Sequence, residues 1–485
     1  MPIDVVIVGG GIAGLAAAYE LSRRGVSCVV LERAARAGGV IFSEVVDGFT
    51  IDGGPDSLLV QKPAAIALCQ EIGLGDRLVP TKPPRLAYIQ RAGTLHALPA
   101  ASVLGIPTRI GPFISSSLFS WPGKVRMGAE LFIPPRRKGD DADESIGAFI
   151  GRRFGREAAT YLAEPLLAGI HAGDVDRLSV RALFPQFVEA ERAHGSLIRA
   201  FRHRSQPGAG NVDGAFRSLP GGLSEIVDAL VRALPAGSVR MGVTVTGIRD
   251  QGAGIRDQSS GIRDQAPGFV LEATGSPPIE ARAVILATPA FVTSEMTREC
   301  DAELSRLCGE IPYASSAAVV LAFARDAVGH PLNGSGFVVP RVEGTGILAT
   351  SWLSSKWPHR APEDRVLLRA FVGGARDPQA LERTDRELVA QSLAALTPLL
   401  AIRAQPLLSR VYRWERANAQ HEVGHLARMA AIERTLARHP GLYLAGSGFR
   451  GVGIPDCIAD ARATATAVAT SLIGHEGTKP RKGSV

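Results

Sequence analysis

The sequence has few cysteines, and their spacing suits neither a disulfide framework nor a metal site. The five cysteines, at positions 28, 69, 300, 308 and 457, include no CxxC pair and stand among apolar residues. Structural disulfides and zinc sites need cysteines, or cysteines and histidines, at characteristic spacings. We therefore expect free, buried thiols, no metal site and a reducing compartment.

Long hydrophobic runs are also missing. No window reaches the roughly 18 uncharged apolar residues that a membrane-spanning helix needs. The start, MPIDVVIVGG, lacks the basic stretch and cleavage site of a secretory signal. Aromatic residues make up only 6% of the chain, and the absence of an aromatic and basic recognition motif argues against nucleic acid as a partner. These absences predict a cytoplasmic protein.

What the chain does contain is enough apolar material for large cores. Its 485 residues are 46% hydrophobic, which suits about three domains of roughly 150 residues each. The 54 Lys and Arg exceed the 47 Asp and Glu, so the net charge is +7. Such a basic surplus favours an anionic partner, for example a membrane surface or a polycarboxylate ligand.

The first 32 residues predict a βαβ unit with a dinucleotide site. Gly9, Gly11 and Gly14 form GxGxxG between the apolar strand VVIV and a helical pattern. These glycines permit a tight turn, close approach of a pyrophosphate and close helix packing. Glu32 ends the second strand 18 residues after Gly14, where its carboxylate can accept hydrogen bonds from ribose hydroxyls.

NAD and FAD share this fingerprint, and the turns that follow favour FAD. Arg36, Gly38 and Gly39 continue the second strand as ExxxRxGG, and IDGGPDS follows at 51–57. Bare backbone in these turns can approach an extended ligand, and the extra anchorage favours the longer cofactor. An ordinary exposed arginine is the alternative interpretation of Arg36.

A second strand, turn and helix stand near the end of the chain. LYLAG at 442–446 leads through a glycine-rich turn into a helix that begins near GIPDCIADA. A helix N-terminus offers N–H groups and positive charge, which would stabilise the negative charge of a reduced flavin. We therefore expect the two turns to bind opposite ends of one FAD. A glycine-rich connection without this role is the alternative.

The pentapeptide GIRDQ occurs three times, beginning at Gly247, Gly254 and Gly261. One glycine and a single large apolar residue in each repeat argue against a coiled coil. We interpret the repeats as a hairpin loop lengthened by duplication, because long loop insertions cost little free energy.

The motifs resemble those of the flavin oxidases of haem synthesis that convert porphyrinogens to porphyrins, which are distantly related to amine oxidases and phytoene desaturases. GGGIAGLAAAYEL and ERAARAGG are common to the wider flavoprotein superfamily. The more specific stretches are GPDSLL (54–59), GIPTRIGPF (105–113), EPLLAGIHAGDVDRLS (164–179), SSKWPHRAPE (354–363) and FRGVGIPDCI (449–458). The resemblance covers nearly the whole chain, is greatest to the bacterial branch, and is interrupted visibly only by the GIRDQ insertion.

The resemblance implies a mixed α/β fold with a Rossmann-like FAD-binding domain, a substrate-binding α+β domain and a helical, membrane-facing domain. The implied boundaries are 1–85 with 215–295 and 410–475 for the FAD domain, 86–104 with 296–409 for the substrate domain, 105–214 for the helical domain, and 476–485 for a flexible tail.

The resemblance also implies which residues contact FAD, from the adenine end to the flavin. The implied set is Gly9, Gly11, Gly14, Glu32, Arg33, Gly39, Gly54, Pro55, Asp56, Ser57, Val245, Trp414, Val452, Gly453 and Ile454. Core packing is the alternative role for Val245 and Trp414.

For the substrate, the resemblance implies that Arg85 pairs with a propionate, that the backbone of Gly169 lines the cavity, and that Trp352 sandwiches a pyrrole ring. Arginine suits a carboxylate because its guanidinium offers two parallel donors. A core position is the alternative for Trp352. No catalytic acid or base is obligatory, and His171 is either a proton acceptor or a structural residue.

The implied activity is the six-electron oxidation of protoporphyrinogen IX, with molecular oxygen as acceptor and hydrogen peroxide as product. Coproporphyrinogen III is the alternative substrate. A flavin oxidase of amines or polyenes and a non-catalytic FAD-binding protein are more distant alternatives. Basic and apolar residues interleaved in the helical region predict contact with an anionic membrane, on the inner face of the cytoplasmic membrane. Product transfer to a ferrochelatase and a homodimer are further expectations.

Overall fold

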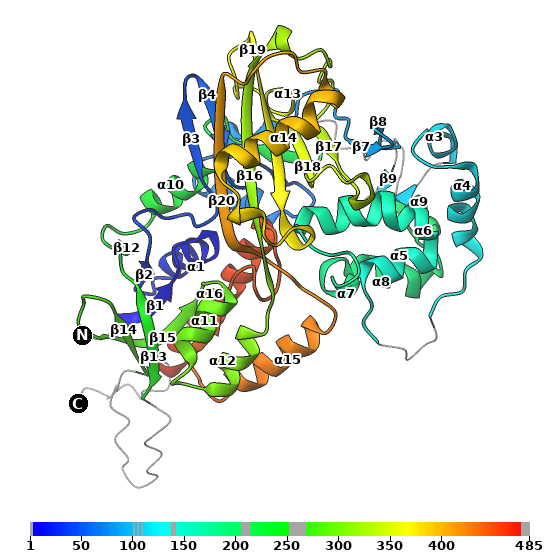
Figure 1. Cartoon of the computed structure of the whole chain (residues 1–485). Coiled ribbons are helices and arrows are strands. Elements are labelled where there is room, and N and C mark those ends of the chain that lie inside the picture. Colours follow the sequence, from blue (N-terminus) through cyan, green and yellow to red (C-terminus); the bar gives the residue numbers. More distant parts are fainter. Residues whose placement is uncertain are drawn as a thin grey trace, which may run out of the picture.

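Two seven-stranded sheets and a helical region lie side by side in Figure 1. The computed structural model describes residues 3–99, 102–103, 106–107, 110–136, 142–204, 214–251 and 268–476. The first sheet and its helices occupy the lower left of Figure 1, the second sheet stands above them, and the helical region extends to the right.

The first sheet is built around parallel strands, as the βαβ pattern predicts. β1 pairs in parallel with β2 and β15, and β21 pairs in parallel with β15. The strand order is β12-β2-β1-β15-β14-β13, with β21 also beside β15. The strands are β1 (Ile3–Val8), β2 (Cys28–Glu32), β12 (Val239–Met241), β13 (Val245–Asp250), β14 (Phe269–Ala273), β15 (Ile279–Leu286) and β21 (Leu442–Leu444).

Helices cover both faces of this sheet. Val5 and Ile7 of β1 are buried in the core on one face, and Val6 and Val8 in the core on the other, because successive side chains of a strand point to opposite faces. The first face is covered by α1 (Ile12–Arg23), α2 (Ala64–Glu71), α10 (Ser224–Ala233) and α16 (Ile454–Glu476), and the second by α11 (Ala290–Thr297), α12 (Ala302–Gly309) and α15 (His425–Leu436). The result is a three-layered α/β domain.

The second sheet is mainly antiparallel, with the strand order β20-β16-β19-β18-β17-β7-β8. One face packs on α14 (Asp385–Leu400). The other face packs on the hairpin of β3 (Ser43–Val46) and β4 (Phe49–Asp52). The strands are β7 (Tyr88–Arg91), β8 (Thr94–Ala97), β16 (Tyr313–Ala324), β17 (Gly336–Val338), β18 (Ala349–Trp352), β19 (Arg365–Gly373) and β20 (Leu408–Ala419).

Two elements lie elsewhere than the expected domain boundaries place them. β20 pairs with β16 in the second sheet, although residues from 410 onward are expected in the FAD domain. Helix α12 packs on the first sheet, although residues from 296 onward are expected in the substrate domain. Both positions depend on contacts with distant segments, which local sequence patterns do not reveal.

The helical region has its own core, which contains the buried phenylalanines Phe149, Phe154, Phe187 and Phe201. Its helices are α3 (Ile110–Ser115), α4 (Trp121–Gly128), α5 (Ile146–Phe154), α6 (Arg156–Ala158), the π-helix η3 (Ala159–Ala168), α7 (Val180–Leu183), α8 (Pro185–His194) and α9 (Leu197–Arg204). The change to helical sequence after about residue 105 is therefore confirmed.

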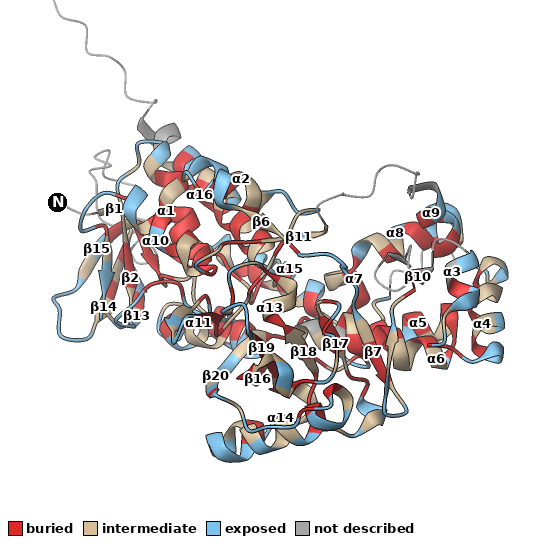
Figure 2. Ribbon diagram, turned by 90° about the horizontal axis from the view of Figure 1, so that it is seen from above, coloured by how far each residue is buried: buried red, intermediate tan, exposed pale blue. Residues whose placement is uncertain are grey.

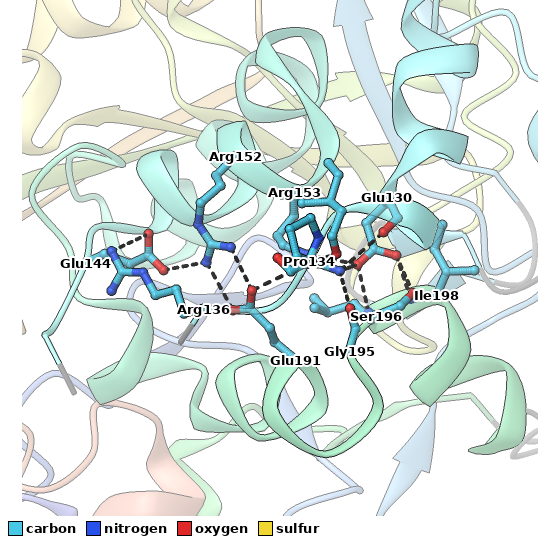
Figure 3. A network of polar contacts seen from close by, with 12 residues as sticks. Glu130, Pro134, Arg136, Glu144, Arg152, Arg153, Glu191, Gly195, Ser196 and Ile198 are labelled. Atoms are coloured by element: carbon cyan, nitrogen blue, oxygen red, sulfur yellow. Dashed lines mark hydrogen bonds and ion pairs between the residues drawn. The ribbon is translucent and has the colours of Figure 1, made fainter. Parts of the chain in front are cut away.

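A buried ion pair stands inside the helical region, as Figure 3 shows. Arg153 and Glu130 have no exposed surface, and Nε of Arg153 donates to Glu130 at 2.9 Å. The same guanidinium donates to the carbonyls of Ile133 (3.0 Å) and Gly195 (2.8 Å). Glu130 also accepts from the N–H of Leu197, at the start of α9. The pair therefore joins α5 to the segments before α5 and after α8.

A neighbouring arginine extends this network toward the surface (Figure 3). Arg152 pairs with Glu191 of α8 at 2.7 Å and with Glu144 at 2.8 Å. Buried charges are tolerated only when they are paired and hydrogen-bonded. The packing of these helices is thus specified by directional polar contacts as well as by apolar burial.

The five cysteines, all of which lie in described segments, are free. Burial raises the pKa of Cys69, Cys308 and Cys457 to about 12. These thiols stay protonated at neutral pH, so they are poor nucleophiles. The expectation of free thiols is confirmed, and the most buried of them are structural.

Within the described ranges, no helix combines the length and apolar character that crossing a bilayer requires. The first GIRDQ repeat runs along β13, which pairs in antiparallel fashion with β14. The second and third repeats fall in 252–267 and the expected tail in 477–485, and both of these segments lie outside the described residues.

Candidate cofactor and substrate site

The turn between β1 and α1 leaves no room for side chains on its inner surface. A Cβ on Gly14 would lie 1.9 Å from the carbonyl oxygen of Gly9, and Gly9 has a φ of +107°, which other residues rarely adopt. Gly11 is the N-cap of α1, and no side chain of the described residues caps the helix there. The space beside its α-carbon is open. This helix N-terminus is therefore shaped to receive a phosphate group.

The ExxxRxGG turn lies directly against the first turn. The N–H of Gly38 donates to the carbonyl of Gly10 at 2.8 Å, and Gly39 approaches the α-carbon of Gly11. Arg36 donates to the carbonyls of Gly39 (2.7 Å) and Ile41 (3.1 Å) within its own turn. Arg36 therefore fixes the conformation of the ExxxRxGG turn. This turn places Gly39 beside Gly11, at the N-terminus of α1.

Glu32 lies beside the first turn. Its carboxylate accepts from the N–H of Gly10 at 2.7 Å and from that of Ala34 at 2.8 Å. Each carboxylate oxygen has a second lone pair for a ribose hydroxyl. Arg33 beside it is exposed, whereas Val245 at the start of β13 is buried.

The first and last glycine turns lie on one edge of the sheet. β1 and β21 both run parallel to β15, so the turns that follow them emerge at the same, carboxyl edge, where doubly wound folds bind ligands. The helices that begin there, α1 and α16, pack against each other. Val452, Gly453 and Ile454 at the start of α16 are partly or fully exposed. One extended cofactor can therefore reach both turns.

The turn at residues 52–57 lies between the two sheets and is pinned by a buried carboxylate. Asp56 accepts from Lys356 (2.8 Å), Trp357 (2.7 Å) and Arg369 (2.9 Å). Burial alone would raise the pKa of Asp56, but the charges of Lys356 and Arg369 outweigh it and hold the pKa well below its usual value. The Asp56 side chain is therefore engaged within the protein, which leaves the backbone of Gly54 and Pro55 for the cofactor.

Two residues of the second sheet bind carbonyl groups of the same turn. Arg369 of β19 donates to the carbonyls of Asp52 and Gly54, each at 2.7 Å. Trp414 of β20 donates from Nε1 to the carbonyl of Gly53 at 2.8 Å. The sequence pattern does not single out Arg369 or Lys356, although Lys356 lies in the stretch SSKWPHRAPE that carries the family resemblance.

The three expected substrate residues have different surroundings. Arg85 is exposed, and its Nε donates to the carbonyl of Thr81 at 3.0 Å. Gly169 is half-buried after the π-helix η3. Trp352 is 0% exposed and packs in the core of the second sheet, with ring centroids 5.0 Å from His330 and 5.6 Å from Tyr88. Residues from several strands close over Trp352, which is the core position given above as the alternative for this residue.

His171 lies between the helical region and the C-terminal turn. Its carbonyl accepts from the side chain of Gln420 at 3.0 Å. Burial and the nearby charge of Lys62 lower the pKa of His171 to about 4, so the imidazole is neutral at pH 7. Lys62 forms a 2.6 Å ion pair with Asp456 in the first turn of α16.

The first sheet has two glycine turns at one edge, an acid after its second strand and a bare helix N-terminus. These features define a protein of the dinucleotide-binding class. The family of flavin containing amine oxidoreductases matches residues 12–469. The chain is 35% identical to the coproporphyrinogen III oxidase of Bacillus subtilis, over 96% of this chain and 98% of the relative. It is 29% identical to the chloroplastic protoporphyrinogen oxidase of Nicotiana tabacum, over 96% of this chain and 85% of the relative.

Solved structures agree with this assignment. A structure from Exiguobacterium sp. 255-15, provisionally named a protoporphyrinogen oxidase, superimposes with a TM-score of 0.83 at 31% identity, covering 97% of this chain and 99% of that one. A putrescine oxidase variant, at 18% identity and a TM-score of 0.69 over 98% and 99% of the two chains, shares the fold. The chain belongs to the flavin containing amine oxidoreductases and, within them, to the porphyrinogen oxidases. It is an FAD-dependent oxidoreductase. The predicted mixed α/β fold of this type and the cofactor are confirmed, and the membrane-facing role of the helical region stays a prediction.

We expect Gly11→Val to prevent FAD binding while leaving the fold intact. A Cβ at this position would meet no protein atom within 4 Å, yet the valine side chain would fill the space offered to the pyrophosphate, and affinity for FAD should fall by about 100-fold or more. The flavin absorbance of the purified protein and titration of the apoprotein with FAD measure this. Gly151→Ala, on α5 and equally unhindered, is the matched control. Wild-type flavin content in Gly11→Val would contradict the assignment.

We expect Asp56→Asn to lower the free energy of unfolding by about 3 kcal/mol at pH 7, because it leaves two buried cations uncompensated. The folded-state pKa of Asp56 lies below its usual value, so its contribution is complete above the unfolded pKa of about 3.9 and is lost as the pH falls through the folded pKa. Denaturant unfolding at pH 7 and near pH 3 should show the difference shrinking in acid. The exposed Asp228 supplies the control Asp228→Asn, and equal effects of the two substitutions would refute this role.

Proposed function

We propose that the protein oxidises coproporphyrinogen III to coproporphyrin III, with molecular oxygen as the acceptor. The sequence motifs alone put protoporphyrinogen IX first. The observation that carries the proposal is the full-length similarity to proteins named coproporphyrinogen III oxidase, from Bacillus subtilis, Propionibacterium freudenreichii and Staphylococcus aureus, at 35%, 33% and 33% identity. The plant protoporphyrinogen oxidase is less similar, at 29%.

The charges near the expected substrate anchor are compatible with this choice. Coproporphyrinogen carries four propionates, two more than protoporphyrinogen. A small sheet of β5 (Leu58–Leu59), β11 (Phe216–Ser218) and β6 (Val79–Pro80) brings basic residues together: Lys82 and Arg85 follow β6, and Arg217 of β11 pairs with Pro80. Such a basic group favours the substrate with more carboxylates.

Each part of the site has a distinct role in this reaction. FAD supplies a hydride acceptor when it is bound. The turns at 52–57 and 452–454 fix the flavin end, Arg85 binds a propionate, and the backbone of Gly169 lines the cavity. His171, neutral at pH 7, is in a protonation state that can accept a proton.

We expect the enzyme to prefer coproporphyrinogen III over protoporphyrinogen IX by at least about tenfold in kcat/KM, since each pairing of a charged group contributes roughly 1.5 to 3 kcal/mol. Porphyrin fluorescence, followed with both substrates under identical aerobic conditions, measures the ratio. As a control, anaerobic bleaching of the flavin band by each porphyrinogen measures reduction of the flavin by the substrate without its reoxidation by oxygen. A higher kcat/KM for protoporphyrinogen IX would identify that compound as the preferred substrate and refute the proposal. If fluorescence increased with neither substrate, porphyrinogen oxidation itself would be refuted.

We further propose that α4 and the turn after it contact an anionic membrane surface. Trp121, Val125 and Phe132 are 67%, 72% and 84% exposed. The spacing of four places Trp121 and Val125 on one face of α4, and Phe132 ends the 3-10 helix η2 (Ala129–Phe132) that follows. Lys124 lies 4.6 Å from the Trp121 ring centroid. Figure 2 shows α4 at the outer end of the helical region, with its exposed residues in pale blue. Transfer of the product to a ferrochelatase and homodimerisation stay predictions.

We expect the protein to float with anionic vesicles and to float less with neutral ones, because aromatic and basic residues together favour an anionic interface. Replacing Trp121 and Phe132 with serine should abolish most of the binding. Val342→Ser, at a residue 65% exposed on another part of the surface, is the control and should change nothing. Protein that stays at the bottom of the gradient with every lipid would refute the membrane contact.

A further inference from the structure

Two histidines stack in the connection between β20 and α15. The rings of His421 and His425 have centroids 3.8 Å apart and planes inclined by 10°. Both side chains are buried. The connection, residues 420–425, lies between two functional parts: the turn at residues 446–453, called here the flavin-head turn, and the helical region.

The side chains of this pair hold the flavin-head turn. Nε2 of His421 lies 3.0 Å from the carbonyl of Ser447, and Nε2 of His425 lies 2.8 Å from the carbonyl of Phe449. A carbonyl oxygen can only accept, so both Nε2 atoms carry the hydrogen. Within the described residues, Nδ1 of His425 has no hydrogen-bond partner. The contacts therefore suit two neutral imidazoles in the same tautomer.

The backbone of the same connection is tied to the helical region. The carbonyl of His421 accepts from the N–H of Ser179 at 2.9 Å, and the N–H of Val423 donates to the carbonyl of Arg177 at 2.9 Å. The N–H of Gly424 donates to Asp143 at 3.2 Å. One residue, His421, thus binds the helical region through its backbone and the flavin-head turn through its ring.

We propose that His421 and His425 are positioning residues for porphyrinogen oxidation, which fix the flavin-head turn relative to the helical region that carries Gly169. The inference rests on the proposed placement of the flavin beside residues 452–454. The pair acts through the turn and touches neither substrate nor cofactor. A small displacement of the turn would move the redox end of FAD relative to the substrate, and such displacements can reduce rates strongly.

The neutral state of the pair is part of this function. Burial and the adjacent His425 lower the pKa of His421 to about 3, and burial lowers the pKa of His425 as well. The charged and titratable neighbours are His171, Arg428 and Asp143, of which only Asp143 favours protonation. A histidine with a lowered folded-state pKa contributes fully above its unfolded pKa of about 6.5, and the contribution is lost as the pH falls below it. Acid should therefore loosen the flavin-head turn.

The test uses the FAD-loaded enzyme and two kinds of substitution at each histidine. His421→Phe and His425→Phe keep a stacking ring but cannot donate, so the visible circular dichroism of the bound flavin should change and kcat should fall by about tenfold with little change in KM. His421→Gln and His425→Gln keep a donor and should restore most of the signal and rate. His439→Gln is the control: that buried histidine binds Asp250 and Asp301, away from the flavin-head turn, and its loss should leave both readouts unchanged.

Phenylalanine variants with the dichroism and kcat of the wild type would overturn the proposal. If these variants do not fold, the pH profile of the double glutamine variant decides. Loss of flavin dichroism as the pH falls toward about 3, the folded-state pKa of His421, in the wild type but not in that variant supports the proposal, and the same loss in both overturns it. Gly453→Val tests the placement of the flavin separately. If flavin dichroism and kcat change in Gly453→Val but not in the histidine variants, only the role of the histidine pair is refuted. If neither readout changes in any of these variants, the placement of the flavin beside residues 452–454 is refuted.

Discussion

The buried pairing of Asp56 with Arg369 and Lys356 is the constraint on which the site depends. A lone carboxylate between the two sheets would be too costly to keep ionised, and each cation would be equally unstable without it. Because Arg369 and Trp414 also bind the carbonyls of residues 52–54, the second sheet cannot shift without moving the turn at 52–57. These contacts fix the turn at 52–57 to the second sheet.

Parallel pairing explains how one cofactor can use both ends of the chain. β1 and β21 are separated by more than 400 residues, yet both lie parallel to β15, so the turns at Gly9 and Gly446 share one edge. The first helix N-terminus suits a pyrophosphate and the last suits a reduced flavin, by the same electrostatics. Glu32 and the ExxxRxGG turn hold the first turn through hydrogen bonds to Gly10. His421 and His425 hold the flavin-head turn in a similar way, through the carbonyls of Ser447 and Phe449.

The helical region combines its apolar core with a buried ion pair and an exposed aromatic side chain. Glu130 and Arg153 have no exposed surface, whereas Phe132, close by in sequence, is 84% exposed. Directional contacts of the buried pair help to specify how α5, α8 and α9 pack. Met127 of α4 belongs to the same core, whereas Trp121 and Val125 of that helix are exposed.

The sequence by itself determined the features that depend on short spacing: the GxGxxG turn, Glu32 at the end of β2, the choice of FAD, and the helical region after residue 105. Tertiary structure decided the rest. Trp352 proved to be a core residue because distant strands close over it, and β20 joined the second sheet because its partner β16 lies about a hundred residues earlier. Asp56 gained its role from Lys356 and Arg369, some 300 residues away. The spacing of residues along the chain determines local backbone geometry. It does not indicate which distant side chain will form an ion pair or complete a hydrophobic core.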